Sequence, residues 1–278
     1  MFKQLLFGTA GVPLSSPTRS SQDGVLQVRK LGLDAMELEF VRGVKMGPEA
    51  AAKMLDLSGK SKVVLTAHGP YYINLVSKEK PKIHASMNRI LETARVAQAC
   101  GAYSITFHAA FYQGTAKEQV YEDVRARMRE IVSKLQEEGI TRLWIRPETT
   151  GKATQFGDID ELIRLSQDVE QVMPCIDWSH LHARSAGREN TAEEFKNTLG
   201  KLETGLGKEA LKNLHCHVSG IAYGEKGEKH HLVLKESDLN YKDLLKVLKS
   251  YKAAGVVISE SPNIEVDARM MKDEYEKA

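Results

Sequence analysis

Short apolar runs recur along the whole chain, and each is followed by a longer segment with the spacing of an amphipathic helix. Runs of this length that are rich in Val, Ile and Leu predict buried strands. The runs occupy residues 3–9, 34–40, 62–68, 103–109, 142–148, 172–177, 211–217 and 254–260. The helical segments occupy residues 21–32, 48–57, 84–100, 117–138, 158–170, 191–203, 241–253 and 266–278. The pattern therefore predicts eight strand–helix units in succession.

Eight such units in 278 residues are typical of a (β/α)₈ TIM barrel, an α/β fold of about 250 residues. The stretches richest in turn formers, 13–22, 182–190 and 220–229, are interpreted as loops after strands rather than as linkers between domains. We therefore expect a single domain over residues 1–278. An open, doubly wound sheet is the alternative fold, and it is disfavoured because no G-x-G-x-x-G follows the first run.

Ionisable side chains stand at or near the ends of most predicted strands. In a closed parallel barrel these ends form one rim, so residues distant in sequence converge there. The set comprises His68, His108, Glu148, Asp177, His180, His215, His217 and Glu260, and the second run carries Glu37 and Glu39. Taken singly, each has a simple structural interpretation, such as a helix cap or a salt bridge. Taken together, they predict a shared polar site at the rim.

The chemistry of this set indicates several metal ions. Imidazole and carboxylate groups without thiolates suit Zn²⁺, Mn²⁺ or Fe²⁺. The set exceeds what one ion needs, and without cations the close approach of so many ionisable groups would be costly. We therefore expect two or three divalent ions per chain, bridged by Glu148 near the middle of the set.

Charge, cysteine content and hydropathy indicate which classes of protein the chain does not belong to. The net charge is only +2 at pH 7, so binding of nucleic acid would require a local basic patch. Cys100, Cys175 and Cys216 are odd in number and show no C-x-x-C spacing, which argues against a disulfide framework. No stretch reaches the roughly 18 apolar residues of a membrane span. We expect a reduced, cytoplasmic protein that does not bind membranes.

With these residues in place, the chain resembles the endonuclease IV family of apurinic/apyrimidinic endonucleases, within the xylose isomerase-like TIM barrel superfamily. The most specific motifs are AHGPYYINL at 67–75, which resembles H-x-x-Y-x-I-N-L, and CIDWSHLHARSAG at 175–187, which resembles C-x-D-x-x-H-x-x-A-x-G. The ending ISESP resembles L-E-T-P. Two blocks depart from the family pattern. Ala109 and Ala110 replace Pro-Gly in FHAAFYQG, and RPETTGKATQFGDIDEL has lost some glycines.

The resemblance implies three zinc sites. The first zinc would be held by His68, His108 and Glu148. The second would be held by Glu148, Asp177, His215 and Glu260. The third would be held by His180 and by a D-x-H pair after the seventh strand. His217 stands where the family has Asn. It is two residues from His215, so the two imidazoles are expected on the same side of the strand, with Cys216 facing the opposite way.

The pair that completes the third site is ambiguous. Where the family has D-R-H, this chain reads Glu228-Lys229-His230-His231. Keeping the i, i+2 spacing selects Glu228 and His230. Aligning the downstream Leu-x-Glu with the family's pattern instead selects His231, and then no acidic residue stands where the family has Asp. The sequence leaves both assignments open.

The activity implied by the resemblance is zinc-dependent cleavage of the phosphodiester 5′ to an abasic site in double-stranded DNA, in base excision repair. Metal-activated hydroxide would attack the phosphorus, with Glu148 and Glu260 positioning the nucleophile. Tyr71 and Tyr72 lie where the family inserts a loop into DNA, and Asn74 could bond either a backbone group or a phosphate. Surface packing is the simple interpretation of the two tyrosines. A monomeric enzyme is expected.

Two other functions compete with this one. A sugar isomerase or epimerase on the same barrel would need one metal, held by Glu148, Asp177, His215 and Glu260, and would leave the remaining histidines surplus. A non-catalytic DNA-binding relative is the second alternative, suggested by the weakened glycine pattern and the altered D-x-H pair. Metal identity and the range of substrates beyond abasic sites are not determined by the sequence.

Overall fold

The computed structural model describes residues 2–278, and Met1 of the predicted domain 1–278 lies outside the described residues. Eight parallel strands form one sheet, in the hydrogen-bonded order β5-β4-β3-β2-β1-β10-β7-β6 within residues 2–278. The strands are β1 (Leu5–Ala10), β2 (Ala35–Glu39), β3 (Val64–His68), β4 (Ser104–Phe107), β5 (Trp144–Pro147), β6 (Ile176–Asp177), β7 (Leu214–Val218) and β10 (Gly255–Ser259). The predicted single-domain TIM barrel is confirmed.

The sheet closes between β5 and the segment just before β6. Parallel bridges join Ile145 to Val172 and Glu148 to Cys175. The buried guanidinium of Arg146 reinforces this seam from β5, because Nη1 donates to Pro174 O at 2.9 Å and Nη2 donates to Asn213 O at 2.7 Å. One side chain therefore ties together three neighbouring segments of the barrel wall.

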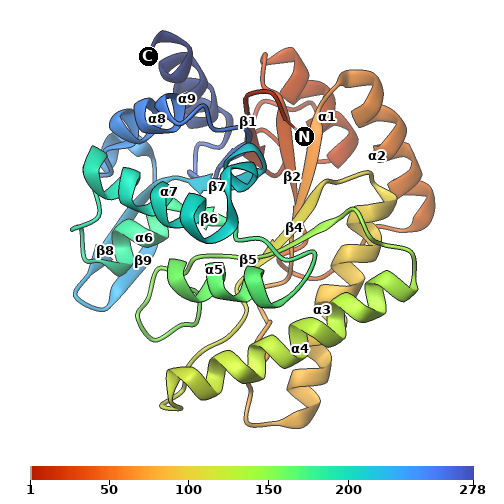
Figure 1. Cartoon of the computed structure of the whole chain (residues 1–278). Coiled ribbons are helices and arrows are strands. Elements are labelled where there is room, and N and C mark those ends of the chain that lie inside the picture. The colour runs from red at the N-terminus through yellow and green to blue at the C-terminus, as the bar shows by residue number, and fades with distance from the viewer. Residues whose placement is uncertain (1) are drawn as a thin grey trace.

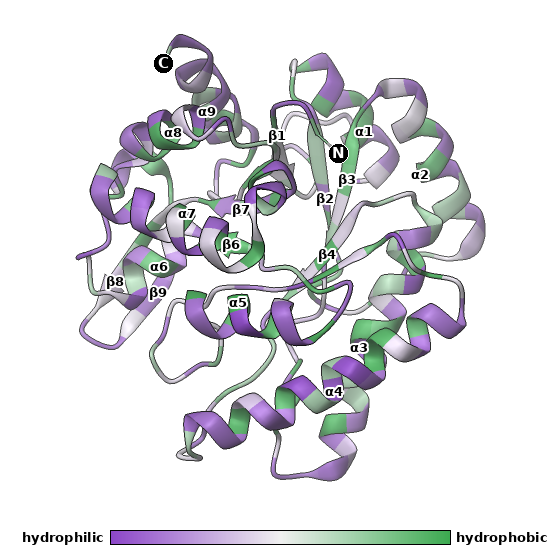
Figure 2. Cartoon of the chain, viewed as in Figure 1, coloured by the Kyte–Doolittle hydropathy of each residue, from purple (hydrophilic) through white to green (hydrophobic). Residues whose placement is uncertain are grey.

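The helices surround the strands, as Figure 1 shows. They are α1 (Ser21–Lys30), α2 (Pro48–Ser61), α3 (Lys80–Ala99), α4 (Lys117–Glu137), α5 (Ile159–Asp168), α6 (Trp178–Arg184), α7 (Ala192–Leu206), α8 (Tyr241–Ser250) and α9 (Glu265–Lys277), with 3₁₀ turns η1 (Lys208–Lys212) and η2 (Leu234–Glu236). In Figure 2 the outer helices α3 and α4 carry both purple and green segments, as expected for helices with one face in water. Among residues 2–278, no helix combines the length and the apolar character needed to cross a membrane.

Side chains along the strands alternate between two environments. Met36 points into the large apolar layer between strands and helices, whereas Ala35 and Val256 belong to a small apolar cluster on the other face, inside the barrel. Farther along the same inward face, Glu37 on β2 is paired in register with Thr66 on β3. The barrel interior therefore changes from apolar to polar toward the carboxyl ends of its strands.

Two of the predicted loops contain regular structure. Residues 220–229 open an antiparallel hairpin of β8 (Gly220–Gly224) and β9 (Gly227–Leu232). Residues 182–190 begin inside the short helix α6, which Asp177 caps by accepting the His180 N–H at 2.7 Å. Both segments are rich in turn formers, so their structure comes from contacts with the rim rather than from local apolar periodicity.

The seam gives a stability prediction. Replacing Arg146 with Leu leaves buried carbonyls without donors, and we expect the free energy of unfolding to fall by about 2–4 kcal/mol. Chemical denaturation would measure the loss. Arg142→Leu is the matched control, because Arg142 lies just before the same strand but is exposed. Equal stabilities for the two variants would contradict the assigned role of Arg146.

Candidate metal centre

Three groups of ligand-type side chains meet at the carboxyl ends of the strands. Within each group the candidate ligand atoms lie within 4.8 Å of one another. The groups are His68 with His108 and Glu148; Glu148 with Asp177, His217 and Glu260; and Asp177 with His180 and His231. Glu148 and Asp177 each belong to two groups, so the three form one continuous cluster, which we call the rim cluster.

Backbone carbonyls fix the orientation of three histidines in the rim cluster. The Nδ1 atoms of His68, His180 and His231 lie 2.7 Å from Gly69 O, 3.0 Å from Thr149 O and 3.1 Å from Glu260 O. A carbonyl can only accept, so each Nδ1 carries a proton, and Nε2 is the nitrogen that can bind a metal ion once its own proton is released. This arrangement is common for metal-ligating histidines, whose other nitrogen donates to a fixed acceptor.

Glu148 is the centre of the first group. Its Oε2 lies 3.4 Å from His68 Nε2 and 3.5 Å from His108 Nε2. Glu148 and His68 are buried, whereas the side chain of His108 is one-quarter exposed. The first group therefore opens toward solvent on the side of β4. All of the residues predicted for the first zinc come together.

The second group contains His217 and not the predicted His215. His217 Nδ1 lies 3.3 Å from Glu148 Oε1 and 3.3 Å from Glu260 Oε1. His215 lies one layer deeper, where its Nδ1 contacts Ser104 Oγ at 2.9 Å. The reason is the extent of β7: the strand runs to Val218, so His217 is the inward-facing residue nearest the rim. The apolar run in the sequence ends at residue 217, and His217 stands where the family has Asn. For these two reasons the sequence predicts His215 as the metal ligand.

A β-bulge resolves the ambiguity of the third group. The register of the hairpin shifts between Ala222 and Tyr223, which leaves one extra residue in β9 and places Glu228 and His231 on the same face. Glu228 Oε2 lies 3.6 Å from His180 Nε2. His230 is exposed and pairs with Ala222 on the opposite face. Both sequence assignments were therefore half right, since the acid comes from one and the imidazole from the other.

Glycine at position 151 allows the hairpin to approach the rim. A Cβ there would lie 2.6 Å from Glu228 Cβ and 3.1 Å from His180 Cδ2. Glu228 N also donates to Gly151 O at 2.9 Å. The loop after β5 and the hairpin thus hold Glu228 against His180, although they are far apart in sequence.

Several carboxylate oxygens in the rim cluster lack hydrogen-bond partners. Glu148 Oε2, Asp177 Oδ2 and Glu260 Oε2 are buried and make no hydrogen bond in the described structure. Buried oxygens of this kind are costly unless something compensates them. Divalent cations would do so, and the nitrogen and oxygen donors present fit ions of the zinc type. The residues of the rim cluster therefore fit a metal centre.

Protons compensate these charges when no cation is present. Burial disfavours the charge of His68, but the hydrogen bond and charge of Glu148 raise the pKa of His68 to about 10. Burial also opposes the charge of His180, yet Asp177 and Glu148 raise its pKa to about 10. For Asp177, burial outweighs the nearby His180 and raises the pKa to about 6. Metal binding would displace these protons from the histidines.

The predicted DNA-contact residues lie on one exposed segment after β3. Tyr71 and Tyr72 are 66% and 71% exposed. With Asn74, Lys78 and other residues they line a cavity of about 810 Å³. Asn74 Oδ1 accepts the Val76 N–H at 3.1 Å, so that oxygen shapes the loop. Tyr71 also packs edge-on against His68, with ring centroids 5.8 Å apart, which connects the segment to the rim cluster.

Comparison with known proteins agrees with the barrel fold. Residues 25–277 match the family model described as xylose isomerase-like TIM barrel. The chain belongs to that family. It is 45% identical to the uncharacterized protein MJ0133 of Methanocaldococcus jannaschii, over 98% of this chain and 97% of the other. It is 24% identical to a probable endonuclease 4 of Mycoplasma pneumoniae, over 76% and 72% of the two chains.

Solved structures support the same fold. Endonuclease IV from Thermus thermophilus superposes with a TM-score of 0.73 at 19% identity, over 97% of this chain and all of the other. A D-tagatose 3-epimerase-like protein superposes with a TM-score of 0.71 at 19% identity, over 97% of each chain. The resemblance to endonuclease IV proteins found in the sequence is therefore supported, while the fold itself is shared with epimerases.

The hairpin yields a paired prediction about metal content. We expect His231→Ala to bind about one metal ion fewer per chain than the parent protein, because a site that loses one of three or four ligands binds zinc poorly. His230→Ala should retain the parental metal content, since His230 faces away from the cluster. Elemental analysis of both variants after dialysis against zinc would measure this. Loss of metal from His230→Ala instead would contradict the bulge assignment.

Proposed function

We propose that the chain is a multi-metal phosphodiesterase of the endonuclease IV type, which cuts double-stranded DNA 5′ to an abasic site during base excision repair. The observation that carries the proposal is the continuity of the rim cluster. Glu148 and Asp177 each join two ligand groups, so the residues favour two or three ions held side by side. In-line displacement at a phosphodiester is a reaction for which neighbouring divalent ions are suited.

The residues divide into two tasks. His68, His108, Glu148, Asp177, His180, His217, Glu228, His231 and Glu260 would hold the ions, with Zn²⁺ favoured and Mn²⁺ or Fe²⁺ as the other candidates. Bound ions would supply an acidified water and a countercharge for the leaving oxygen. Glu148 and Glu260 face each other across His217 Nδ1, so their oxygens can orient that water toward phosphorus.

DNA would lie across the exposed segment after β3. Tyr71 and Tyr72 present aromatic faces to solvent beside the rim cluster, which suits them to enter a base step next to the missing base. Lys78 and Lys82 line the same cavity and offer positive charge to a phosphate. The side-chain amide of Asn74 remains available for a phosphate oxygen. The enzyme would act as a monomer in the cytoplasm; three buried, free cysteines accord with such a reducing compartment.

An epimerase is the second candidate function. The second ligand group, Glu148 with Asp177, His217 and Glu260, is complete without the other two and could polarise a sugar carbonyl through one ion. The first and third groups would then have no task. The curated relatives of M. pneumoniae and Staphylococcus aureus named as probable endonuclease 4 also favour the nuclease. A non-catalytic DNA-binding protein would keep the cavity beside Tyr71 and Tyr72 and would bind the ions, but it would not cleave DNA.

Cleavage of a defined duplex tests the proposal. We expect purified protein to cut a duplex that carries one tetrahydrofuran abasic analogue, leaving a 3′-hydroxyl, and a chelator to abolish the cut. Glu148→Gln should lower kcat by roughly 100-fold or more, the scale of losing one catalytic group. Glu276→Gln, at the exposed end of α9, is the matched control. Binding without cleavage by metal-loaded protein would indicate the non-catalytic relative, and epimerisation of a ketose the second candidate.

The tyrosines give a separate prediction about DNA binding. Tyr72→Ala should raise KM for the abasic duplex roughly tenfold, the effect of losing one aromatic stacking contact. Its kcat should change little, because Tyr72 does not belong to the rim cluster. Steady-state kinetics would separate the two constants, and Tyr251→Ala, on the far end of the barrel after α8, serves as the control. An unchanged KM would remove Tyr72 from the DNA interface.

A further inference from the structure

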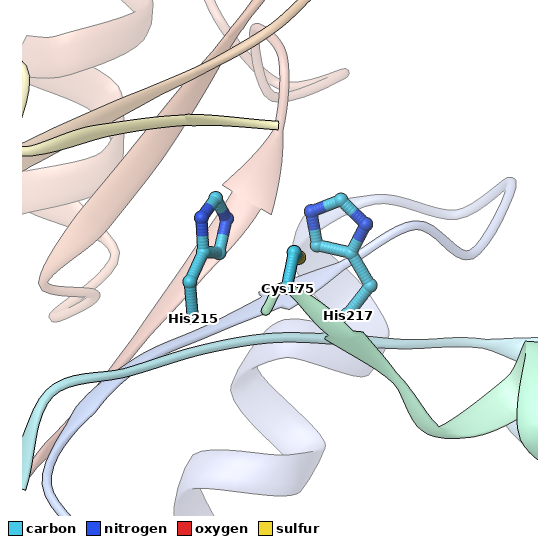
Figure 3. A group of neighbouring side chains, drawn as sticks. All are labelled: Cys175, His215 and His217. Carbon is cyan, nitrogen blue, oxygen red and sulfur yellow. The ribbon is translucent and has the colours of Figure 1, made fainter. Parts of the chain in front are cut away.

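A second convergence of ligand-type side chains lies beneath the rim cluster, inside the barrel wall. Candidate ligand atoms of Cys175, His215 and His217 lie within 4.8 Å of one another, and all three residues are fully buried. Figure 3 shows the two imidazoles with their rings turned toward each other and the Cys175 side chain between their bases. The predicted zinc sites do not include a sulfur ligand, so this group is distinct in chemistry.

The backbone holds these three residues firmly. Two of them, His215 and His217, stand at alternate positions on β7 and therefore share its inward face. Cys175 lies at the barrel seam, where its N–H donates to Pro147 O and its carbonyl accepts from Thr149 N, both at 3.0 Å. The intervening residue of β7, Cys216, belongs instead to the apolar layer under the helices.

The nitrogens that face the centre of this group lack hydrogen bonds. His215 Nε2, His217 Nε2 and Glu37 Oε1 are buried atoms without an aligned partner. Glu37 Oε2 lies 3.0 Å from His215 Nε2, and Glu37 Oε1 lies 2.9 Å from His217 Nε2. These contacts are close, but their angles do not fit hydrogen bonds. Such orphaned atoms are rare in protein interiors. Separations near 3 Å also fit two ligands that share one ion, since zinc–nitrogen and zinc–oxygen bonds are about 2.0–2.2 Å long.

The other nitrogen of each ring is already engaged. His215 Nδ1 lies 2.9 Å from Ser104 Oγ, and an Nδ1–H can donate to the serine oxygen, which leaves Nε2 with its lone pair. His217 Nδ1 faces Glu148 and Glu260 in the rim cluster. Each histidine is therefore oriented so that Nε2 is directed into the deeper group. The serine and the rim cluster fix these orientations from outside the group.

We propose that Cys175, His215 and His217 bind an additional divalent transition-metal ion of the zinc type, which we call the inner ion. Two imidazoles and one thiolate are ligands that zinc prefers over magnesium or calcium. Glu37 faces both Nε2 atoms from strand β2 and can supply an oxygen ligand as well as countercharge. The Thr66 hydroxyl holds it by donating to its Oε2 at 2.8 Å. Binding releases the Cys175 thiol proton and the Nε2 proton of His217, whose ring then bridges the inner ion and the rim cluster.

Cobalt substitution tests the inner ion directly. Every ligand of the rim cluster is a nitrogen or an oxygen, so only a cysteine ligand can produce a sulfur-to-cobalt charge-transfer band in the near ultraviolet. We expect the cobalt-loaded protein to show this band and to hold one cobalt per chain more than the Cys175→Ser variant. The band should disappear in Cys175→Ser and weaken in His215→Ala. Visible cobalt bands from the rim cluster should remain in both.

Matched cysteine variants make the assignment. Cys216→Ser and Cys100→Ser remove the other two thiols, neither of which belongs to the group, and both should keep the charge-transfer band. If Cys175→Ser fails to fold, the band in the parent protein, retained in these two variants, assigns it to Cys175 by elimination. The proposal is overturned if the cobalt-loaded parent protein has no such band, or if Cys175→Ser keeps it. Neither readout depends on DNA cleavage, so a failure of the proposed nuclease activity is distinguished.

Discussion

The close approach of buried carboxylates at the rim is the main physical constraint on this structure. Glu148 and Asp177 sit at the strand ends with oxygens that no hydrogen bond satisfies, and each faces histidines from several strands. Two neighbouring negative charges with little water around them would repel and would be poorly solvated. Protonated histidines offset them in the free chain, and cations of higher charge density would do so better. The barrel tolerates this cost at the one rim where chemistry can use it.

The supporting layers are arranged around that constraint. Backbone carbonyls accept hydrogen bonds from the Nδ1 atoms of His68, His180 and His231, so Nε2 is the nitrogen that can bind a cation once its proton is released. The hairpin β8–β9 brings Glu228 and His231 over the open side of the rim, and close contact at Gly151 lets it approach. Elements outside the barrel thus complete a site that the eight strands only begin.

Polarity does not stop at the rim. The layer below, with Glu37, Thr66 and Ser104 on three neighbouring strands, is also buried and polar, and it receives His215 from β7. His217 spans the two layers, because one nitrogen faces Glu148 and the other faces Glu37. A change in charge or position of Glu37 would therefore act on Glu148 through the imidazole ring of His217.

The order of strands and helices, the barrel, and the gathering of His68, His108, Glu148, Asp177 and Glu260 followed from the sequence. Apolar periodicity is local, and closure of a parallel barrel brings every strand end to one rim. The choice of His217 over His215, and of Glu228 with His231, was decided only by the tertiary structure. Those choices depend on where β7 ends and on one extra residue in β9. Both are set by pairing with distant segments, and a shift of one residue reverses which side chain faces inward.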